Sequence, residues 1–166
     1  LWSHGPVELA MRYGQPSIES ALRKLAGQGI TRVTLAPLYP QFADSTTTTA
    51  LVEARRVIAG WQLPIRLGGL QPCFAEPADL DALAESVRPY LQQDFDHLLL
   101  SYHGLPERHL HKLDPTGQHC LKAADCCQRA EGAVLQSCYR AQRYQVSGAF
   151  AQRSGLRPGP WSGACQ

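Results

Sequence analysis

The sequence predicts an α/β fold in which parallel β-strands are flanked by helices. Helical and strand-like patterns alternate along the 166 residues, with Gly or Pro in the loops between them. The strand-like runs are short and mostly apolar, as in parallel sheets that carry helices on both faces. Polar or aromatic loops follow three of these runs. We therefore expect parallel sheets covered on both faces, with ligands bound beyond the carboxyl ends of the strands.

Local signals place the elements of the first half. The first helix has apolar residues at helical spacing, Ser17 as its N-cap, and a glycine at position 27 or 29 as its end. The second helix has Ser45 or Thr46 to accept bonds from its first free N–H groups, and Gly60 closes it. We expect helices over residues 16–29 and 47–59, a buried strand over 31–39 and a short strand over 65–70.

The second half continues the alternation. Its first helix has Pro77 near the first turn and a kink at Pro89. A buried strand follows, and then a long helical segment that is interrupted near Gly132. We expect helices over residues 77–93 and most of 119–154, and strands over 95–104 and from Trp161 onward.

Composition argues against several classes of protein. The formal net charge is +2, from 16 basic and 14 acidic residues, and the basic residues form no run or stripe. This balance argues against a nucleic-acid-binding protein. No apolar stretch approaches the roughly 18 residues of a transmembrane span. Residues 1–14 lack the basic and apolar regions of a signal peptide. We therefore expect a cytoplasmic protein without a transmembrane segment.

The six cysteines are unevenly spread. Cys73 and Cys165 stand apart and are expected to be plain core cysteines. The others fall within one short segment, at Cys120, Cys126, Cys127 and Cys138. In a reducing compartment such clustered thiols indicate a metal before a disulfide. Their spacing matches no standard zinc or ferredoxin pattern, however, and the two adjacent cysteines would be crowded as ligands.

Three loops follow predicted strands, which is where open α/β sheets bind their ligands. They read LYPQFADST, GGLQPCF and SYHGLPERH. His103 lies in the third, between Tyr102 and a rigid Gly-Leu-Pro turn. A neutral imidazole can accept a proton or bind a metal there, or simply hydrogen-bond within the loop, so both roles stay open. His109, His111 and His119 are expected to be solvated loop histidines.

Four segments carry a resemblance that covers about residues 6 to 145. They read VELAMRYGQPSI, APLYPQFADSTTTT, SYHGLPERHLHKLDP and CYRAQ. In this order they resemble the ferrochelatases, enzymes that insert ferrous iron into a porphyrin to make haem. The most specific match is SYHGLP at residues 101–106, followed by Asp114-Pro115. The Tyr-Pro-Gln loop at 39–41 and the Met-Arg-Tyr-Gly loop at 11–14 come next.

The resemblance implies roles for individual residues. His103 is the catalytic residue, which takes a pyrrole proton and can bind the Fe²⁺ substrate. Arg12 and Tyr13 line the porphyrin cleft, where a guanidinium can meet a propionate and a ring can stack on the macrocycle. Tyr39 and Gln41 belong to a loop of the same cleft and are expected to bind the porphyrin.

The resemblance also implies two similar α/β lobes that face the porphyrin cleft. Residues 1–94 are then the later part of the first lobe and residues 95–166 the start of the second, with a cysteine-containing helical insertion at about 119–143. The chain opens on the approach to a helix and stops within a strand, so both ends are expected to be incomplete. We expect a fragment that is inactive alone, because the family's active-site glutamate has no candidate here.

Several alternatives stay open. The motifs do not separate protoporphyrin IX from coproporphyrin as the substrate of this lyase, and peripheral membrane association is compatible with either. Some bacterial members of the family carry a [2Fe–2S] cluster on four cysteines, and the clustered cysteines supply that ligand set. Otherwise they are unligated thiols. If the protein is not an enzyme, the alternative is a non-catalytic iron–sulfur or metal-binding module.

Overall fold

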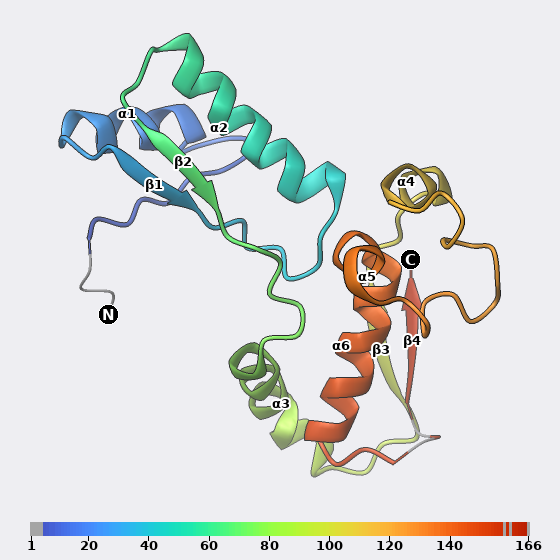
Figure 1. Ribbon diagram of the computed structural model, residues 1–166. Helices are drawn as coiled ribbons and strands as arrows, with labels where there is room; N and C mark the ends of the chain where they lie inside the picture. Colours follow the sequence, from blue (N-terminus) through green and yellow to red (C-terminus); the bar gives the residue numbers. More distant parts are fainter. Residues whose placement is uncertain (1–4, 158, 160, 166) are drawn as a thin grey trace. The chain divides into compact units, whose positions relative to one another are not determined.

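The computed structural model describes residues 5–157, 159 and 161–165, and it confirms the predicted α/β class (Figure 1). The strands are β1 (Arg32–Leu35), β2 (Arg66–Gly69), β3 (Leu98–Tyr102) and β4 (Trp161–Cys165). The helices are α1 (Ile18–Gly27), η1 (Asp44–Thr48), α2 (Thr49–Gly60), α3 (Pro77–Leu91), α4 (Glu107–Leu113), α5 (Gly132–Ser137) and α6 (Tyr139–Arg153). Within the described ranges, no helix combines the length and the apolar character that crossing a membrane requires.

The chain divides into two compact units. Unit 1 comprises residues 1–38 and 44–71, and unit 2 comprises residues 39–43 and 72–166. Helix α3 falls in unit 2, where it packs against α6. The predicted lobe boundary between residues 94 and 95 therefore does not coincide with the division into compact units. The lobe boundary stays a prediction, because a segment of one lobe can pack in a compact unit that consists mainly of the other.

In unit 1, α1 and α2 pack against a parallel pair of strands. Strands β1 and β2 run in register from Arg32 opposite Arg66 to Leu35 opposite Gly69. The core is formed by the buried residues Ile18, Leu22, Ala54, Val57 and Ile65. Helix α2 approaches β2 so closely that a Cβ on Gly69 would lie 2.9 Å from Leu51 Cδ2. Glycine at this position therefore allows the close packing of helix on strand.

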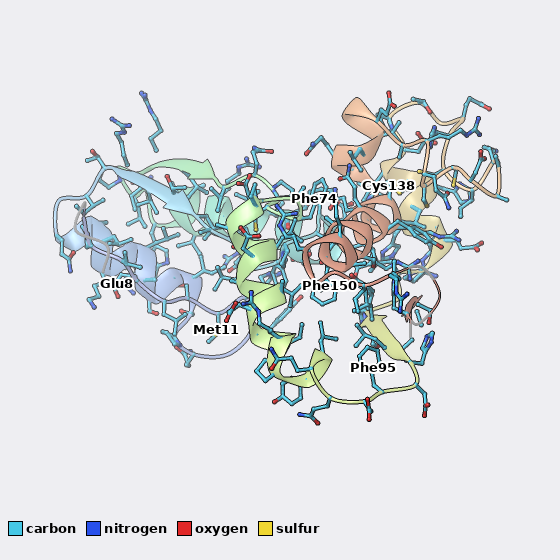
Figure 2. The ribbon with its side chains drawn as sticks, turned by 90° about the horizontal axis from the view of Figure 1, so that it is seen from below. Glu8, Met11, Phe74, Phe95, Cys138 and Phe150 are labelled. Atoms are coloured by element: carbon cyan, nitrogen blue, oxygen red, sulfur yellow. The ribbon has the colours of Figure 1, made fainter. Side chains whose placement is uncertain are left out.

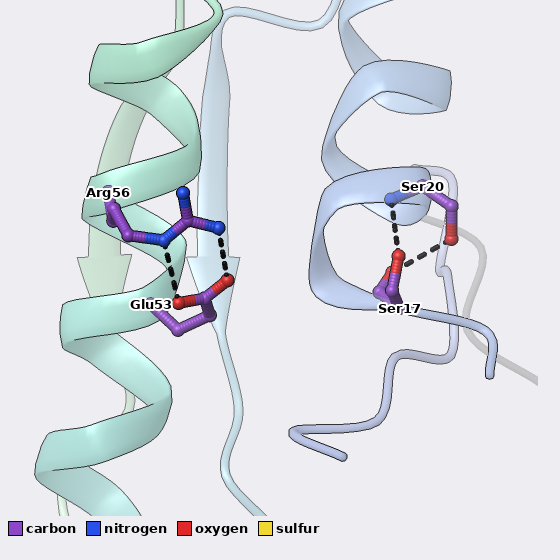
Figure 3. Close-up of polar contacts among 4 residues, drawn as sticks. All are labelled: Ser17, Ser20, Glu53 and Arg56. Atoms are coloured by element: carbon purple, nitrogen blue, oxygen red, sulfur yellow. Dashed lines mark hydrogen bonds and ion pairs between the residues drawn. The ribbon is translucent and has the colours of Figure 1, made fainter. Parts of the chain in front are cut away.

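The start of α1 confirms the predicted N-cap, whereas the start of α2 does not. Ser17 Oγ accepts a hydrogen bond of 3.1 Å from the Ser20 N–H (Figure 3). Before α2, the predicted capping by Ser45 or Thr46 is wrong, because the π-helical turn η1 continues directly into the helix. The Thr49 hydroxyl donates instead to the carbonyl oxygens of these two residues.

In unit 2, the strands β3 and β4 form a second parallel pair, from Leu98 opposite Trp161 to Tyr102 opposite Cys165. Helix α6 lies beside this pair (Figure 1), and a Cβ on Gly163 would lie 3.5 Å from Ser147 Oγ on that helix. Helices α3 and α6 share a small core that contains Phe74, Leu80 and Val146.

The strands are less buried than the sequence predicts. Leu99 in β3 is 53% exposed, and burial alternates along both β1 and β3. Alternate side chains of a strand point to opposite faces, so the pattern means that one face of each pair is covered and the other is open within the described part of the chain. The expectation of buried strands with both faces covered is wrong for these residues.

The predicted helix over 119–154 is wrong in its first third. Residues 119–131 form turns, and helical structure begins only at α5, with α6 following. Leu121 adopts a left-handed φ of 61°, which interrupts a right-handed helix. The Asp114 carboxylate also accepts hydrogen bonds from the N–H groups of His119 and Cys120, which fixes the chain in a turn.

Candidate functional site

His103 lies exposed directly after the carboxyl end of β3. The residue before it, Tyr102, is held by helix α6. Its hydroxyl lies 2.9 Å from Ser147 Oγ, and the Arg143 guanidinium carbon lies 5.6 Å from the centre of its ring. The strand end is therefore anchored while the imidazole reaches solvent.

The loop after β1 that contains Tyr39 and Gln41 belongs to the same unit as His103. Tyr39 is 42% exposed. The loop is fixed at Phe42, whose backbone N–H donates a 2.7 Å hydrogen bond to the side-chain oxygen of Gln142 on α6. Both the loop and the strand end before His103 are thus attached to one helix.

Arg12 and Tyr13 lie in a loop of unit 1 that precedes α1. The loop is closed by a 2.7 Å hydrogen bond from the Met11 N–H to the Pro16 carbonyl oxygen, and Gly14 supplies a left-handed φ of 91°. The Arg12 guanidinium carbon lies 4.6 Å from the centre of the Tyr13 ring, which is largely exposed. Arg12 itself is half-buried, and its Nε is buried without a hydrogen-bond partner among the described residues.

Arg12 also lies near an ion pair on α2. Glu53 Oε1 and Oε2 accept hydrogen bonds from Arg56 at 2.7 and 2.9 Å (Figure 3). The Arg56 hydrogen bond is the main reason that the pKa of Glu53 is lowered, and the charge of Arg12 contributes a smaller part. Arg56 is therefore the hydrogen-bonded partner of this carboxylate, and Arg12 acts on it only through its charge.

The cysteines of the 120–138 segment gather in one buried cluster of unit 2. The members are Cys120, Cys126, Cys127 and Cys138, all at most 8% exposed. Leu110, Ala130, Val134 and Ala141 complete the apolar surroundings. Cys138 is also the N-cap of α6, where its Sγ accepts a 3.4 Å hydrogen bond from the Ala141 N–H (Cys138 is labelled in Figure 2). We refer to these four residues as the thiol cluster.

The pKa values of three cysteines in the thiol cluster are shifted in opposite directions. A hydrogen bond from Cys127, helped by the N–H groups at the start of α6, lowers the pKa of Cys138 to about 6. Donating that bond raises the pKa of Cys127, and burial raises that of Cys120 to about 12. Cys138 therefore ionises more readily than Cys120 and Cys127. Ionising the others would bring like charges together in a buried space.

Asp114 and His119, for which the sequence predicts no such role, organise the segment that carries the thiols. His119 Nε2 lies 2.7 Å from the Cys126 carbonyl oxygen, so the expectation of a solvated loop histidine is wrong for this residue. His109 and His111 lie on α4 rather than in a loop. Asp114 accepts hydrogen bonds from three backbone N–H groups and one hydroxyl, on Thr116, His119 and Cys120.

The thiols of the thiol cluster are the ligand type of an iron–sulfur cluster. All four cysteines line one pocket, together with Leu110, His119, Leu121 and Arg140. Among the described residues, no group of three or more His, Cys, Asp or Glu side chains is arranged to hold a metal ion. Sγ of Cys126 and Sγ of Cys127 are 3.9 Å apart. The four cysteines converge from turns and from one helix end, and thiolates are the ligands that such clusters require. Cys73 is half-buried and outside this group, and the side chain of Cys165 lies outside the described residues.

Comparison with known proteins decides the family. The family model described as Ferrochelatase matches residues 3–165. The chain belongs to the ferrochelatase family. It is 68% identical to the ferrochelatase of Stutzerimonas stutzeri over 161 residues, which are 97% of this chain and 47% of that protein. It is 63% identical to the ferrochelatase of Pseudomonas fluorescens (strain SBW25) over 99% of this chain and 48% of that protein. The chain thus spans about half the length of these ferrochelatases.

In this ferrochelatase-family chain, we predict that Asp114→Ala loosens the thiol-cluster segment. Partial burial opposes ionisation, but the bonds from Cys120, Thr116 and His119 outweigh it and hold the Asp114 pKa well below its usual 3.8. Hydrogen bonds to a charged group are each worth about 1.5–3 kcal/mol, so a loss of at least that size is expected in the free energy of unfolding. Urea unfolding of the full-length variant measures it.

The pH dependence supplies the control for Asp114. The pKa of Asp114 is lower in the folded chain than in the unfolded chain. Its carboxylate therefore contributes fully to stability above the pKa of the unfolded state, and this contribution is lost as the pH falls toward the pKa of the folded state. The loss of stability below about pH 4 should therefore be shallower in Asp114→Ala. The matched variant is Asp125→Ala, which removes an exposed carboxylate that pairs with Arg129. Its free energy of unfolding and the pH dependence of that energy should change little. Equal effects of the two variants would contradict the capping role.

Proposed function

We propose that the full-length protein carrying this chain inserts ferrous iron into a porphyrin to form haem. The observation that carries the proposal is the family match over residues 3–165, which contains His103 exposed at the carboxyl end of a parallel strand. That edge of the sheet is the usual ligand-binding position of α/β folds. The proposal places the reaction in haem biosynthesis and makes the enzyme a metal chelatase of the lyase class.

Each candidate residue has its own role in the proposed reaction. His103 accepts a proton from a pyrrole nitrogen and offers an imidazole nitrogen to Fe²⁺ as the ion loses its water. Arg12 meets a propionate, and Tyr13 stacks on the macrocycle. Tyr39 and Gln41 contact the porphyrin from the loop after β1. Arg12 and Tyr13 belong to unit 1, and the other three belong to unit 2.

We propose protoporphyrin IX as the porphyrin, with coproporphyrin as the alternative. The two differ in the number of propionates, and one candidate cation, Arg12, suits the porphyrin with fewer carboxylates. The test compares kcat/KM of the full-length protein for the two porphyrins under anaerobic conditions with Fe²⁺. A higher value for coproporphyrin would overturn the assignment, and no turnover with either would overturn the proposed function.

Arg12→Ala is predicted to weaken porphyrin binding more than turnover. A charge-assisted contact with a propionate is worth about 1.5–3 kcal/mol, which is about a 10- to 150-fold rise in Kd. Quenching of porphyrin fluorescence on titration with the full-length protein measures it. Arg23, whose guanidinium also lies over an aromatic ring, that of Trp61 at 4.0 Å, supplies the matched variant Arg23→Ala. An unchanged Kd for Arg12→Ala would remove this residue from the binding site.

We also propose that the thiol cluster holds a [2Fe–2S] cluster in the intact protein. Its four cysteines would be the ligands, and the bound cluster would supply a one-electron redox centre. The support is the burial of all four thiols in one group of unit 2 and the stabilisation of one thiolate at the start of α6. The same observation favours a second candidate function, that of an iron–sulfur or metal-binding module without catalysis. An insertion assay beside a visible absorption spectrum separates the two.

Three further predictions accompany the proposed function. Residues 1–94 belong to one α/β lobe and residues 95–166 to a second, with the insertion at about 119–143. The protein works in the cytoplasm, where peripheral contact with the membrane would allow transfer of an apolar porphyrin. Residues 1–166 alone lack turnover, because the chain spans about half the length of the related ferrochelatases.

A further inference from the structure

The side chain of Gln142 is completely buried on α6, with 0% of its surface exposed. Its amide nitrogen donates hydrogen bonds to the carbonyl oxygens of Leu135 at 2.9 Å and Gln136 at 3.0 Å. Its oxygen accepts the 2.7 Å bond from the Phe42 N–H. A buried amide would destabilise the fold if it were left without partners, and here both of its ends are used.

These bonds join three segments, of which one is distant from the other two in the sequence. The Phe42 bond reaches across 100 residues to the loop of Tyr39 and Gln41. The bonds to Leu135 and Gln136 reach the end of α5, immediately before Cys138 of the thiol cluster. Gln142 is therefore the contact through which the loop is attached both to α6 and to the chain that leaves the thiol-cluster segment.

The same helix holds the strand end before His103. Ser147 lies five residues after Gln142, about 7.5 Å farther along the helix axis, and its hydroxyl bonds that of Tyr102. Arg143, the neighbour of Gln142, lies over the ring of Tyr102 as well. One rigid helix thus fixes the spacing between the His103 strand end and the Tyr39–Gln41 loop.

We propose that Gln142 is a positioning residue of the porphyrin site, which holds the Tyr39–Gln41 loop at a set distance from the strand end of His103. The inference rests on the proposed function, because the loop matters only if it contacts the porphyrin. Gln142 touches no substrate. It acts through the Phe42 N–H, and its loss releases the loop without altering the imidazole.

The test uses two variants of the full-length protein and a matched control. Gln142→Met keeps the length of the side chain and removes all three bonds. It is expected to raise the KM for the porphyrin at least about fivefold, which is the effect of one lost hydrogen bond, and to change kcat little. Gln142→Glu keeps an oxygen that can accept from Phe42 but loses the amide donor to Leu135 and Gln136, so its KM should lie between those of Gln142→Met and the wild type. Val146→Ala, on the same helix but packed against Phe74 and Leu80, should lower the Tm and leave the KM unchanged.

Amide hydrogen exchange gives a second readout that does not need turnover. The Phe42 N–H should exchange at least about tenfold faster in Gln142→Met and be protected in Gln142→Glu. An unchanged KM in Gln142→Met with a lowered Tm, as in Val146→Ala, would overturn the positioning role. So would an unchanged exchange rate at Phe42. Absence of turnover in the wild type would instead contradict the proposed function, and porphyrin Kd values of the same variants would then decide the inference.

Discussion

Replacing His103 by alanine in the full-length protein is expected to lower the rate of iron insertion at least about 100-fold, since positioned acid–base groups contribute about 10²- to 10⁴-fold. Alanine can neither take a pyrrole proton nor offer a nitrogen to Fe²⁺. Porphyrin binding should change little, because the imidazole is exposed and Tyr102, not His103, anchors the strand end to α6. Anaerobic stopped-flow measurement of haem formation, with porphyrin Kd from fluorescence, provides both quantities.

His111 supplies the control for this variant. It is an exposed histidine on α4, a few residues beyond His103. His111→Ala removes the same chemical group from the same region and should leave the rate unchanged. A rate for His103→Ala within a factor of a few of the wild type would mean that the imidazole serves only the loop. A large loss of porphyrin affinity would mean that the residue binds the macrocycle instead.

Replacing Cys138 by alanine is expected to abolish assembly of a [2Fe–2S] cluster and to destabilise the start of α6. The cysteine is one of four proposed ligands and also the N-cap of the helix. Loss of an N-cap typically costs about 1 kcal/mol in the free energy of unfolding. Visible absorption after anaerobic reconstitution with iron and sulfide measures the first effect, and thermal unfolding of the unreconstituted protein measures the second.

Cys73→Ala is the matched control, because Cys73 is a half-buried cysteine outside the thiol cluster. Its absorption spectrum after reconstitution should equal that of the wild type. An iron–sulfur spectrum that survives in Cys138→Ala would exclude this cysteine as a ligand. A wild type that takes up no cluster would show that the four residues are unligated thiols, whose packing alone explains their burial.

Most elements of the fold could be predicted from the sequence, because their signals are local. Ser17 caps α1 and apolar spacing marks α1, as the structure confirms. The turns over 119–131 could not be predicted in the same way. Their residues include good helix formers, and the conformation depends on the carboxylate of Asp114, five and six residues before the N–H groups that it binds, and on burial of the thiols. Tertiary contacts here override local propensity.

The candidate site was predictable only where a motif names its residues. His103 stands out because it follows an apolar strand and precedes a Gly-Leu-Pro turn. Gln142 and Asp114 lie in two of the segments that carry the resemblance, CYRAQ and SYHGLPERHLHKLDP, but the motif assigns neither of them a role. Their importance comes from their partners, Phe42 and the backbone of residues 116–120, which only the folded chain brings within hydrogen-bonding distance.

The most direct test of the proposed function is an anaerobic assay of Fe²⁺ insertion into protoporphyrin IX, run in parallel on the full-length protein and on residues 1–166. We predict turnover by the full-length protein and none above the uncatalysed rate by residues 1–166, because the chain spans about half the length of the related ferrochelatases. No turnover by the full-length protein would contradict the proposed iron insertion. Turnover by residues 1–166 would show that this chain alone carries the whole site.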